Sequence, residues 1–235
     1  MRHFMFFKTL EHETQDARAY LMEAPVLTAI PEGRFDLNSY SYFLSQAYHH
    51  VKHTVPLMMA CGSRLPPRLE WVREALVDYI RDEYGHQEWI LNDLEALGED
   101  AEAVRNGRPD RPIEMMIAWL YDAIQRGNPM SFFGMVHVLE GTSIKLATPL
   151  GEQVQKTLGL PENAFSYLYS HGALDQDHFQ FFTSLINRIE RSDDQQAVIH
   201  ASQVIYRLYG DMLHAIPVAT RKQAAAREHV DVRSV

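Results

Sequence analysis

The chain has 235 residues, of which 46% are hydrophobic and 23% are charged, and its net charge is -9 when histidine is neutral. The acidic balance argues against non-specific nucleic-acid binding, which needs a basic surface, and no apolar run reaches the roughly 18 residues that a membrane span needs. A single cysteine, Cys61, excludes an internal disulfide and a thiolate metal cluster.

The first residues form a short apolar run from Met1 to Phe7 that leads directly into Glu11, Glu13 and Asp16. No small-residue cleavage site follows the run, so a secretory signal peptide is not expected. We therefore expect the protein to be cytoplasmic.

Helical periodicity extends along nearly the whole chain, and no alternating β-branched run indicates a strand. The pattern predicts seven helices, at about 3–23, 37–62, 67–97, 112–126, 129–158, 161–191 and 193–215. The polar residues 98–111 are predicted to form the longest loop, and residues 218–235 a weakly ordered tail. With no internal linker, residues 1–217 are predicted to form a single all-α domain.

Several residues mark the predicted helix ends. Asn128 precedes Pro129, which suits a cap followed by a first-turn proline. Gly98 suits the left-handed position after a helix. Ser192 and Gln195 have the spacing of a capping box, in which the side chain of each residue binds the backbone amide of the other residue.

The first group of candidate ligands is Glu83 and His86, in the segment Asp82-Glu83-x-x-His86. Residues three apart share a helix face, and here that face also carries Tyr79, Ile80 and Ile90. A buried carboxylate is costly unless it is paired or bound to a metal. An exposed glutamate–histidine pair would explain this segment equally well.

The second group is His171-x-x-x-Asp175-x-x-His178, whose offsets of 0, 4 and 7 also lie on one helix face. Apolar residues share that face, so a purely solvated surface explains the three polar residues poorly. Asp175 could bind a metal directly or orient the two histidines through hydrogen bonds.

Glu140 stands alone in an apolar run, where a carboxylate needs a cation or a proton. His137 lies three residues earlier, so the two could simply satisfy each other.

The predicted second helix offers Gln46, His49, His50 and His53. His49 and His53 share one face, and Gln46 and His50 share another. Spacing alone leaves open which face points inward.

These donors are oxygen and imidazole nitrogen, which suit iron, manganese or zinc; open coordination positions favour iron and oxygen chemistry. The sequence has no His-Glu-x-x-His element, no phosphate-binding glycine loop and no Gly-x-Ser-x-Gly elbow.

The all-helical outline, together with segments 48–54, 82–89, 92–98 and 171–178, resembles the heme-oxygenase-like superfamily over residues 5–215. Within it the chain is most similar to the iron-containing branch, the heme-oxygenase-like diiron oxidases and oxygenases. The resemblance implies a bundle of about seven helices around a central pocket.

The resemblance also implies a set of metal ligands, to which the histidines of the second helix are added as candidates: Glu83, His86, Glu140, His171, Asp175, His178, His49 and His53. An acid is expected on the second helix, and its absence here favours one well-formed metal position over two. The implied protein is an oxidase or oxygenase that binds one or two iron ions, or another transition metal, with the catalytic carboxylate Glu140, or another carboxylate, as a bridge. O2 and a small organic molecule would be its substrates, and a homodimer its assembly.

Other relatives on this fold fit less well. A TenA-type thiaminase has a nucleophilic cysteine on the fifth helix, where this chain has Glu140, and an acid near the position of Ala47. Pyrroloquinoline quinone synthase binds an acidic quinone precursor, which the carboxylate-rich set does not suit. Heme would need an axial histidine near the N-terminus, and His12 could take that place, but nothing else in the sequence supports heme.

The alternative is a metal-free, TenA-like binding or interaction protein without redox activity. In that case the acids and histidines would form a hydrogen-bonded polar core.

Overall fold

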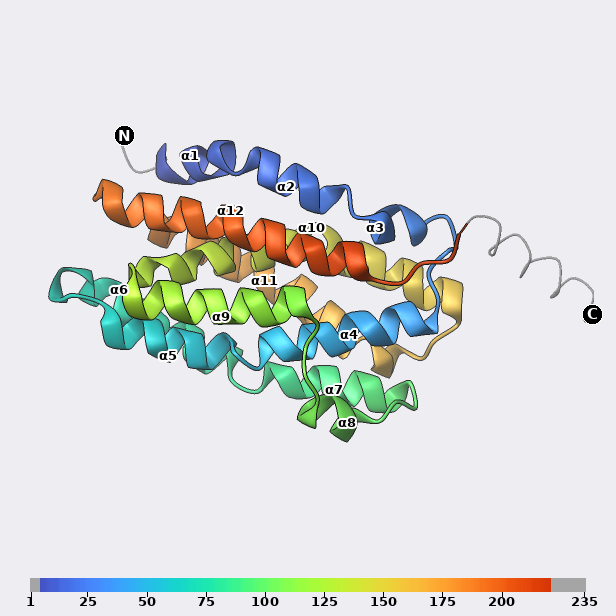
Figure 1. Cartoon of the computed structure of the whole chain (residues 1–235). Coiled ribbons are helices and arrows are strands. Elements are labelled where there is room, and N and C mark those ends of the chain that lie inside the picture. Colours follow the sequence, from blue (N-terminus) through green and yellow to red (C-terminus); the bar gives the residue numbers. More distant parts are fainter. Residues whose placement is uncertain (1–4, 221–235) are drawn as a thin grey trace, which may run out of the picture.

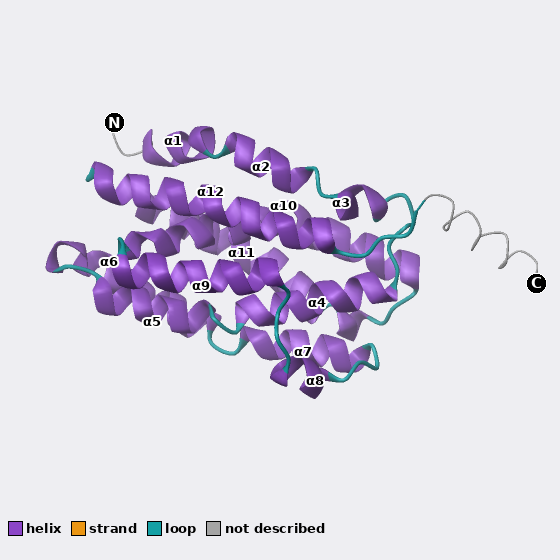
Figure 2. Cartoon of the chain, in the orientation of Figure 1, coloured by secondary structure: helices purple, strands orange, loops and turns teal. Residues whose placement is uncertain are grey.

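The computed structural model describes residues 5–220, apart from the side chains of residues 5 and 171–177. Every regular element in these residues is a helix (Figure 2). The first half contains α1 (Met5–Glu13), α2 (Gln15–Met22), α3 (Pro25–Ala29), α4 (Leu37–Val51), α5 (Thr54–Arg64), the 3₁₀ turn η1 (Pro67–Leu69), α6 (Glu70–Glu83), α7 (His86–Ala96) and α8 (Ala101–Asn106). The second half contains α9 (Arg111–Arg126), η2 (Pro129–Ser131), α10 (Phe132–Leu158), η3 (Glu162–Ala164), α11 (Ser166–Ile186) and α12 (Ser192–Ala215).

The predicted all-α class is confirmed, but three of the predicted long helices are divided. The 3–23 segment is interrupted at Thr14, the 37–62 segment at residues 52–53, and the 67–97 segment at residues 84–85. The predicted loop at 98–111 contains the short helix α8. Apolar periodicity continues across each break, so the sequence pattern alone does not reveal them.

Two of the predicted helix-end residues are confirmed. The Asn128 side chain accepts a hydrogen bond from the Met130 amide at 3.0 Å, directly before Pro129 at the start of η2. Gly98 adopts a left-handed φ of 81° after α7. These residues end or begin helices because they satisfy exposed backbone groups or adopt φ values that other residues avoid.

The predicted capping box at Ser192 and Gln195 is wrong. The helix α12 has no side-chain cap, and the side-chain amide of Gln195 instead donates to the Ile189 carbonyl at 2.7 Å. The structure has a capping box at α4, where the Asp36 carboxylate accepts from the Ser39 amide at 3.0 Å.

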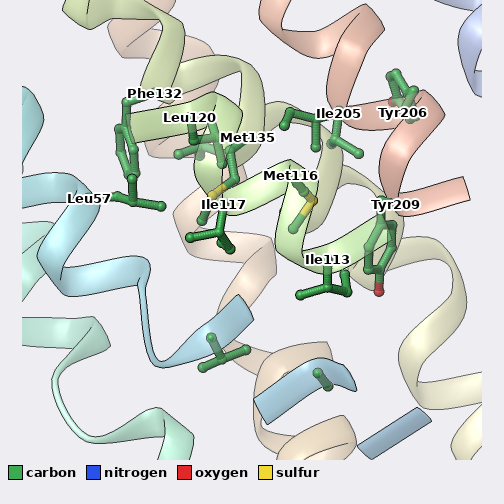
Figure 3. Packing of buried hydrophobic residues seen from close by; sticks show 14 of the residues in the cluster. Leu57, Ile113, Met116, Ile117, Leu120, Phe132, Met135, Ile205, Tyr206 and Tyr209 are labelled. Atoms are coloured by element: carbon green, nitrogen blue, oxygen red, sulfur yellow. The ribbon is translucent and has the colours of Figure 1, made fainter. Parts of the chain in front are cut away.

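The long helix α10 runs beside both α11 and α12 (Figure 1). Gly134 allows its close approach to α12, because a Cβ at this position would lie 2.4 Å from the Cβ of Ala201. Apolar side chains from α5, α9, α10 and α12 fill the space between these helices, among them Leu57, Leu120, Met135 and Ile205 (Figure 3). The helix α10, which carries the candidate ligand Glu140, is thereby held in a fixed register against its neighbours.

The end of the described chain lies against the segment that precedes α4. The Ala219 amide donates to the Arg34 carbonyl at 2.9 Å, and the Arg34 guanidinium donates to the Ala219 carbonyl at 2.9 Å. Most of the predicted 218–235 tail lies outside the described residues. No helix that the structure describes is both long and apolar enough to cross a membrane.

Candidate metal centre and its cavity

Glu83 and His86 lie on two different helices that meet at a sharp turn. Glu83 is the last residue of α6, His86 is the first of α7, and Gly85 between them has a left-handed φ of 95°. The Glu83 carboxylate and the His86 Nδ1 nevertheless approach to 3.1 Å, and both side chains are buried. The predicted proximity is therefore confirmed, but the predicted continuous helix is not.

A second imidazole reaches the same carboxylate from α11. The His178 Nδ1 lies 3.5 Å from the Glu83 Oε1, and the His178 Nε2 lies 3.9 Å from the more exposed Asp82. The Tyr79 hydroxyl donates to the His178 backbone carbonyl at 3.4 Å. Glu83 is thus the carboxylate at which α6, α7 and α11 meet.

Asp93 fixes the position of α11 relative to α7. It is fully buried, and its carboxylate accepts hydrogen bonds from the amides of Ser166 and Tyr167 at 2.8 and 2.9 Å. A carboxylate at this place satisfies the free amides of the first turn of α11 and complements the helix dipole. Asp93 was not singled out in the sequence analysis. The usable signal was its position among the apolar residues Ile90, Leu91 and Leu94 of the predicted helix.

Glu140 lines the same cavity as Glu83, from the first half of α10. The next residue of α10 packs on α11: a Cβ on Gly141 would lie 3.3 Å from the ring of Phe179, which follows His178. The neighbouring His137 does not serve Glu140, because its Nδ1 lies 3.1 Å from the Ser202 hydroxyl on α12. Of the two explanations that the sequence left open for Glu140, the structure removes the pairing with His137.

His171 and Asp175 are the remaining predicted ligands on α11, and their side chains lie outside the described residues. The helical backbone of α11 continues through both positions, so they share a face with His178. Among the side chains that the structure does describe, no three histidine, cysteine, aspartate or glutamate residues form a metal site. The roles of His171 and Asp175 as ligands stay predictions.

The structure shows which face of the second predicted helix points toward the cavity. Gln46 accepts a hydrogen bond from the Asp110 amide at 2.9 Å, and the His53 Nδ1 lies 3.2 Å from the Tyr121 hydroxyl. His49 is buried, and burial lowers its pKa to about 4. None of these three lines the cavity, whereas His50 does. A role of His49 or His53 as a metal ligand therefore gains no support from their placement.

His50 meets Tyr209 of α12 at the cavity wall, ring edge to ring face, with the ring centroids 5.7 Å apart. Tyr209 lines the cavity, and burial raises the pKa of its hydroxyl. No sequence signal singles out Tyr209, because it occurs in the ordinary apolar pattern of α12.

The cavity has a volume of about 150 Å³ and is lined by residues from helices α3 to α6 and α10 to α12. Its acidic lining residues are Glu83 and Glu140, and the other described lining residues include no lysine or arginine. Cys61 is not in the lining; it is buried in α5, where its thiol contacts the Pro129 carbonyl at 3.2 Å. Burial raises the pKa of that thiol to about 12, which makes it a poor nucleophile.

The donors around Glu83 fit a metal ion with mixed oxygen and nitrogen ligands. A buried carboxylate between two imidazoles, with Glu140 in the same cavity, is the kind of set that helical bundles use for iron. The fold and this site define a heme-oxygenase-like helical protein with a candidate metal centre.

The chain belongs to the family of iron-containing redox enzymes, whose model matches residues 41–210. No curated protein sequence matches it significantly.

Solved structures share the fold at low sequence identity. A domain of unknown function with a heme oxygenase-like fold from Shewanella denitrificans has a TM-score of 0.77 at 19% identity, over 97% of this chain and 95% of its own. A TenA homologue from Pseudomonas syringae has a TM-score of 0.73 at 12% identity, over 94% and 93%. A CADD-like protein of unknown function from Nostoc punctiforme has a TM-score of 0.67 at 15% identity, over 89% and 97%.

Proposed function

We propose that this protein is an iron-dependent oxidase or oxygenase that acts with O2 on a small organic substrate. The observation that carries the proposal is the convergence of His86 and His178 on the buried Glu83, at 3.1 and 3.5 Å. Membership of the iron-containing redox enzyme family supports it.

In this proposal iron is held by the acids and histidines predicted from the sequence, namely Glu83, His86, Glu140, His171, Asp175 and His178. Bound iron supplies the redox chemistry that oxidation by O2 requires. One or two ions, or another transition metal, are compatible with such a donor set, and Glu140 would be one of the carboxylates that hold them. His50 is the residue of the second predicted helix that is placed to add a nitrogen donor or to orient the substrate.

The rest of the cavity would bind the substrate and exclude water. Its walls are mainly apolar, and the polar exceptions are Tyr40, Thr54, Thr142, Ser143, Tyr167 and Tyr209. Apolar walls raise the strength of every charge interaction inside the cavity. The Tyr209 hydroxyl can hold a polar group of the substrate next to His50.

The test is the metal content of the protein after expression in iron-supplemented medium, measured by elemental analysis. Near-stoichiometric iron is expected in the wild type, with strong losses in Glu83→Gln and His178→Ala. His200→Ala serves as the control, because His200 is exposed and its ring contacts Trp119 instead. Circular dichroism of each variant separates loss of metal from loss of fold.

A folded protein that binds no transition metal under any loading condition would overturn the proposal. It would leave the metal-free, TenA-like binding protein as the better interpretation. This second function is supported by the TenA homologues among the proteins that share the fold.

A further inference from the structure

The cavity has a polar region at Glu83 and Glu140, and on one side of it a long apolar arm follows the register of α10. Glu140, Ser143, Ala147, Leu150 and Val154 line it at spacings of three and four residues, so they form one stripe. From Glu140 to Val154 this stripe rises about 21 Å, at 1.5 Å per residue. Beyond Ser143, every lining residue that α10 contributes is apolar.

The walls opposite this part of α10 are apolar as well. Val26 and Leu27 of α3 line the cavity, and so do Leu213 of α12 and the following Ile216. Figure 1 shows α3, the end of α12 and the last turns of α10 at the same end of the bundle. The arm therefore leads from the carboxylates toward that end.

The cavity is narrow for its length. Ligand pockets are commonly about 300–1,000 Å³, whereas this one holds about 150 Å³ along its extended lining. A small volume distributed along the rise of about 21 Å from Glu140 to Val154 leaves room for a slender ligand and excludes a bulky one.

Two segments that are far apart in the sequence close the far end of the arm. Phe35 and Ile216 both line the cavity, and the residues beside them are joined by hydrogen bonds. Arg34 and Ala219 exchange two hydrogen bonds of 2.9 Å, and the Ser39 hydroxyl donates to the Pro217 carbonyl at 2.5 Å. These bonds hold Phe35 and Ile216 in place as an end wall.

We propose that the substrate carries a slender apolar chain that lies along the second half of α10, and that Phe35 sets the longest chain that fits. The inference rests on the proposed function, because only that function makes the carboxylates beside the arm part of a metal centre that acts on the substrate. The arm itself is defined by apolar residues that bind no metal.

The test measures binding of straight-chain neutral alcohols, from n-hexanol to n-hexadecanol, to chelator-treated protein, by isothermal titration calorimetry. Affinity should rise roughly fourfold for each added methylene, which corresponds to about 0.8 kcal/mol. It should stop rising when the chain reaches the end wall. Because no iron is needed, failure of this test is distinguishable from failure of the iron proposal.

Two variants should move the length limit in opposite directions. Phe35→Ala removes part of the end wall, so longer alcohols should gain affinity. Ala147→Leu fills the arm between the carboxylates and the wall, so the limit should move to shorter alcohols. The control is Leu37→Ala, because Leu37 is close to Phe35 in sequence but exposed and outside the lining.

Affinity that does not depend on chain length would overturn the inference, and so would tighter binding of the bulky 1-adamantanol than of n-decanol. If Phe35→Ala fails to fold, Ala147→Leu still decides the question, because a limit that stays unchanged in this variant contradicts the proposed path.

Discussion

The Glu83 carboxylate and the His86 imidazole meet at 3.1 Å across a break between two helices. A continuous α-helix would also bring residues three apart together. Here Gly85, with its φ of 95°, ends α6 and turns the chain so that α7 begins with His86. Each ligand can thus be oriented by the packing of its own helix.

Replacing Gly85 with alanine should weaken iron binding. A left-handed conformation costs an L-residue about 1–2 kcal/mol. No atom lies within 4 Å of the position of the new Cβ, so the cost is confined to the backbone. The thermal midpoint should fall by roughly 2–4 °C for each kcal/mol in a domain of this size, and iron per chain should decrease.

The matched control is Gly98→Ala, which has a φ of 81° and equally open surroundings but follows the other end of α7. It should lose similar stability and keep its iron. Equal iron content in both variants would show that the turn at Gly85 has no part in the site.

Replacing Asp93 with alanine should destabilise the protein and loosen its metal binding. The change removes the acceptor of the Ser166 and Tyr167 amides, and each buried amide left without a partner costs about 1–3 kcal/mol. Because Asp93 joins α7 to α11, the distance between His86 and His178 should become less fixed. Chemical unfolding and the rate of iron loss to a chelator measure the two effects.

Asp100→Ala is the control for this experiment. Asp100 caps α8 by accepting from the Ala103 amide at 2.9 Å, on the surface and away from the ligands. It should cost about 1 kcal/mol without changing the rate of iron loss. If both variants lose iron faster to a similar extent, the cause is a general loss of stability and not the contact between α7 and α11.

Gly134→Ala should be strongly destabilising, while Gly62→Ala should be neutral or stabilising. A Cβ on Gly134 would lie 2.4 Å from the Ala201 Cβ and 2.6 Å from the Ser202 amide nitrogen, so α10 and α12 would have to separate. Overpacking of this kind costs about 1–3 kcal/mol. At Gly62 the nearest atom is 3.6 Å away, and alanine favours the helix by up to about 1 kcal/mol. Urea unfolding measures both changes, and equal effects would contradict the close crossing.

His137 should make the protein less stable as the pH falls below neutrality. Burial lowers its pKa from 6.5 to about 3, so the unfolded chain binds a proton at a higher pH than the folded one. Stability is therefore complete above the unfolded pKa and is lost as the pH falls from 6.5 toward 3. The loss from this group can reach about 1.4 kcal/mol per pH unit.

The variant His137→Leu should reduce that dependence, measured by urea unfolding at about pH 7 and about pH 5. Ser202 keeps a partner in this variant, because its hydroxyl donates to the Val198 carbonyl at 2.9 Å. Replacing the exposed His200 with leucine should keep the wild-type slope. An unchanged slope in His137→Leu would mean that other groups cause the acid sensitivity.

The sequence by itself determined that the protein is all helical and which segments carry the acids and histidines. Periodicity is a local property, so it places Glu83 near His86 and puts His171, Asp175 and His178 on one face. It does not give the rotation of a helix against its neighbours. That rotation depends on packing across the whole chain.

Only the tertiary structure decided which residues of the second predicted helix point toward the cavity. It placed His50 against Tyr209 and turned His53 toward Tyr121. It also joined Arg34 to Ala219, which are 185 positions apart, to close the apolar arm. Contacts over such separations depend on the packing of all the intervening helices, and for this reason no local pattern in the sequence reveals them.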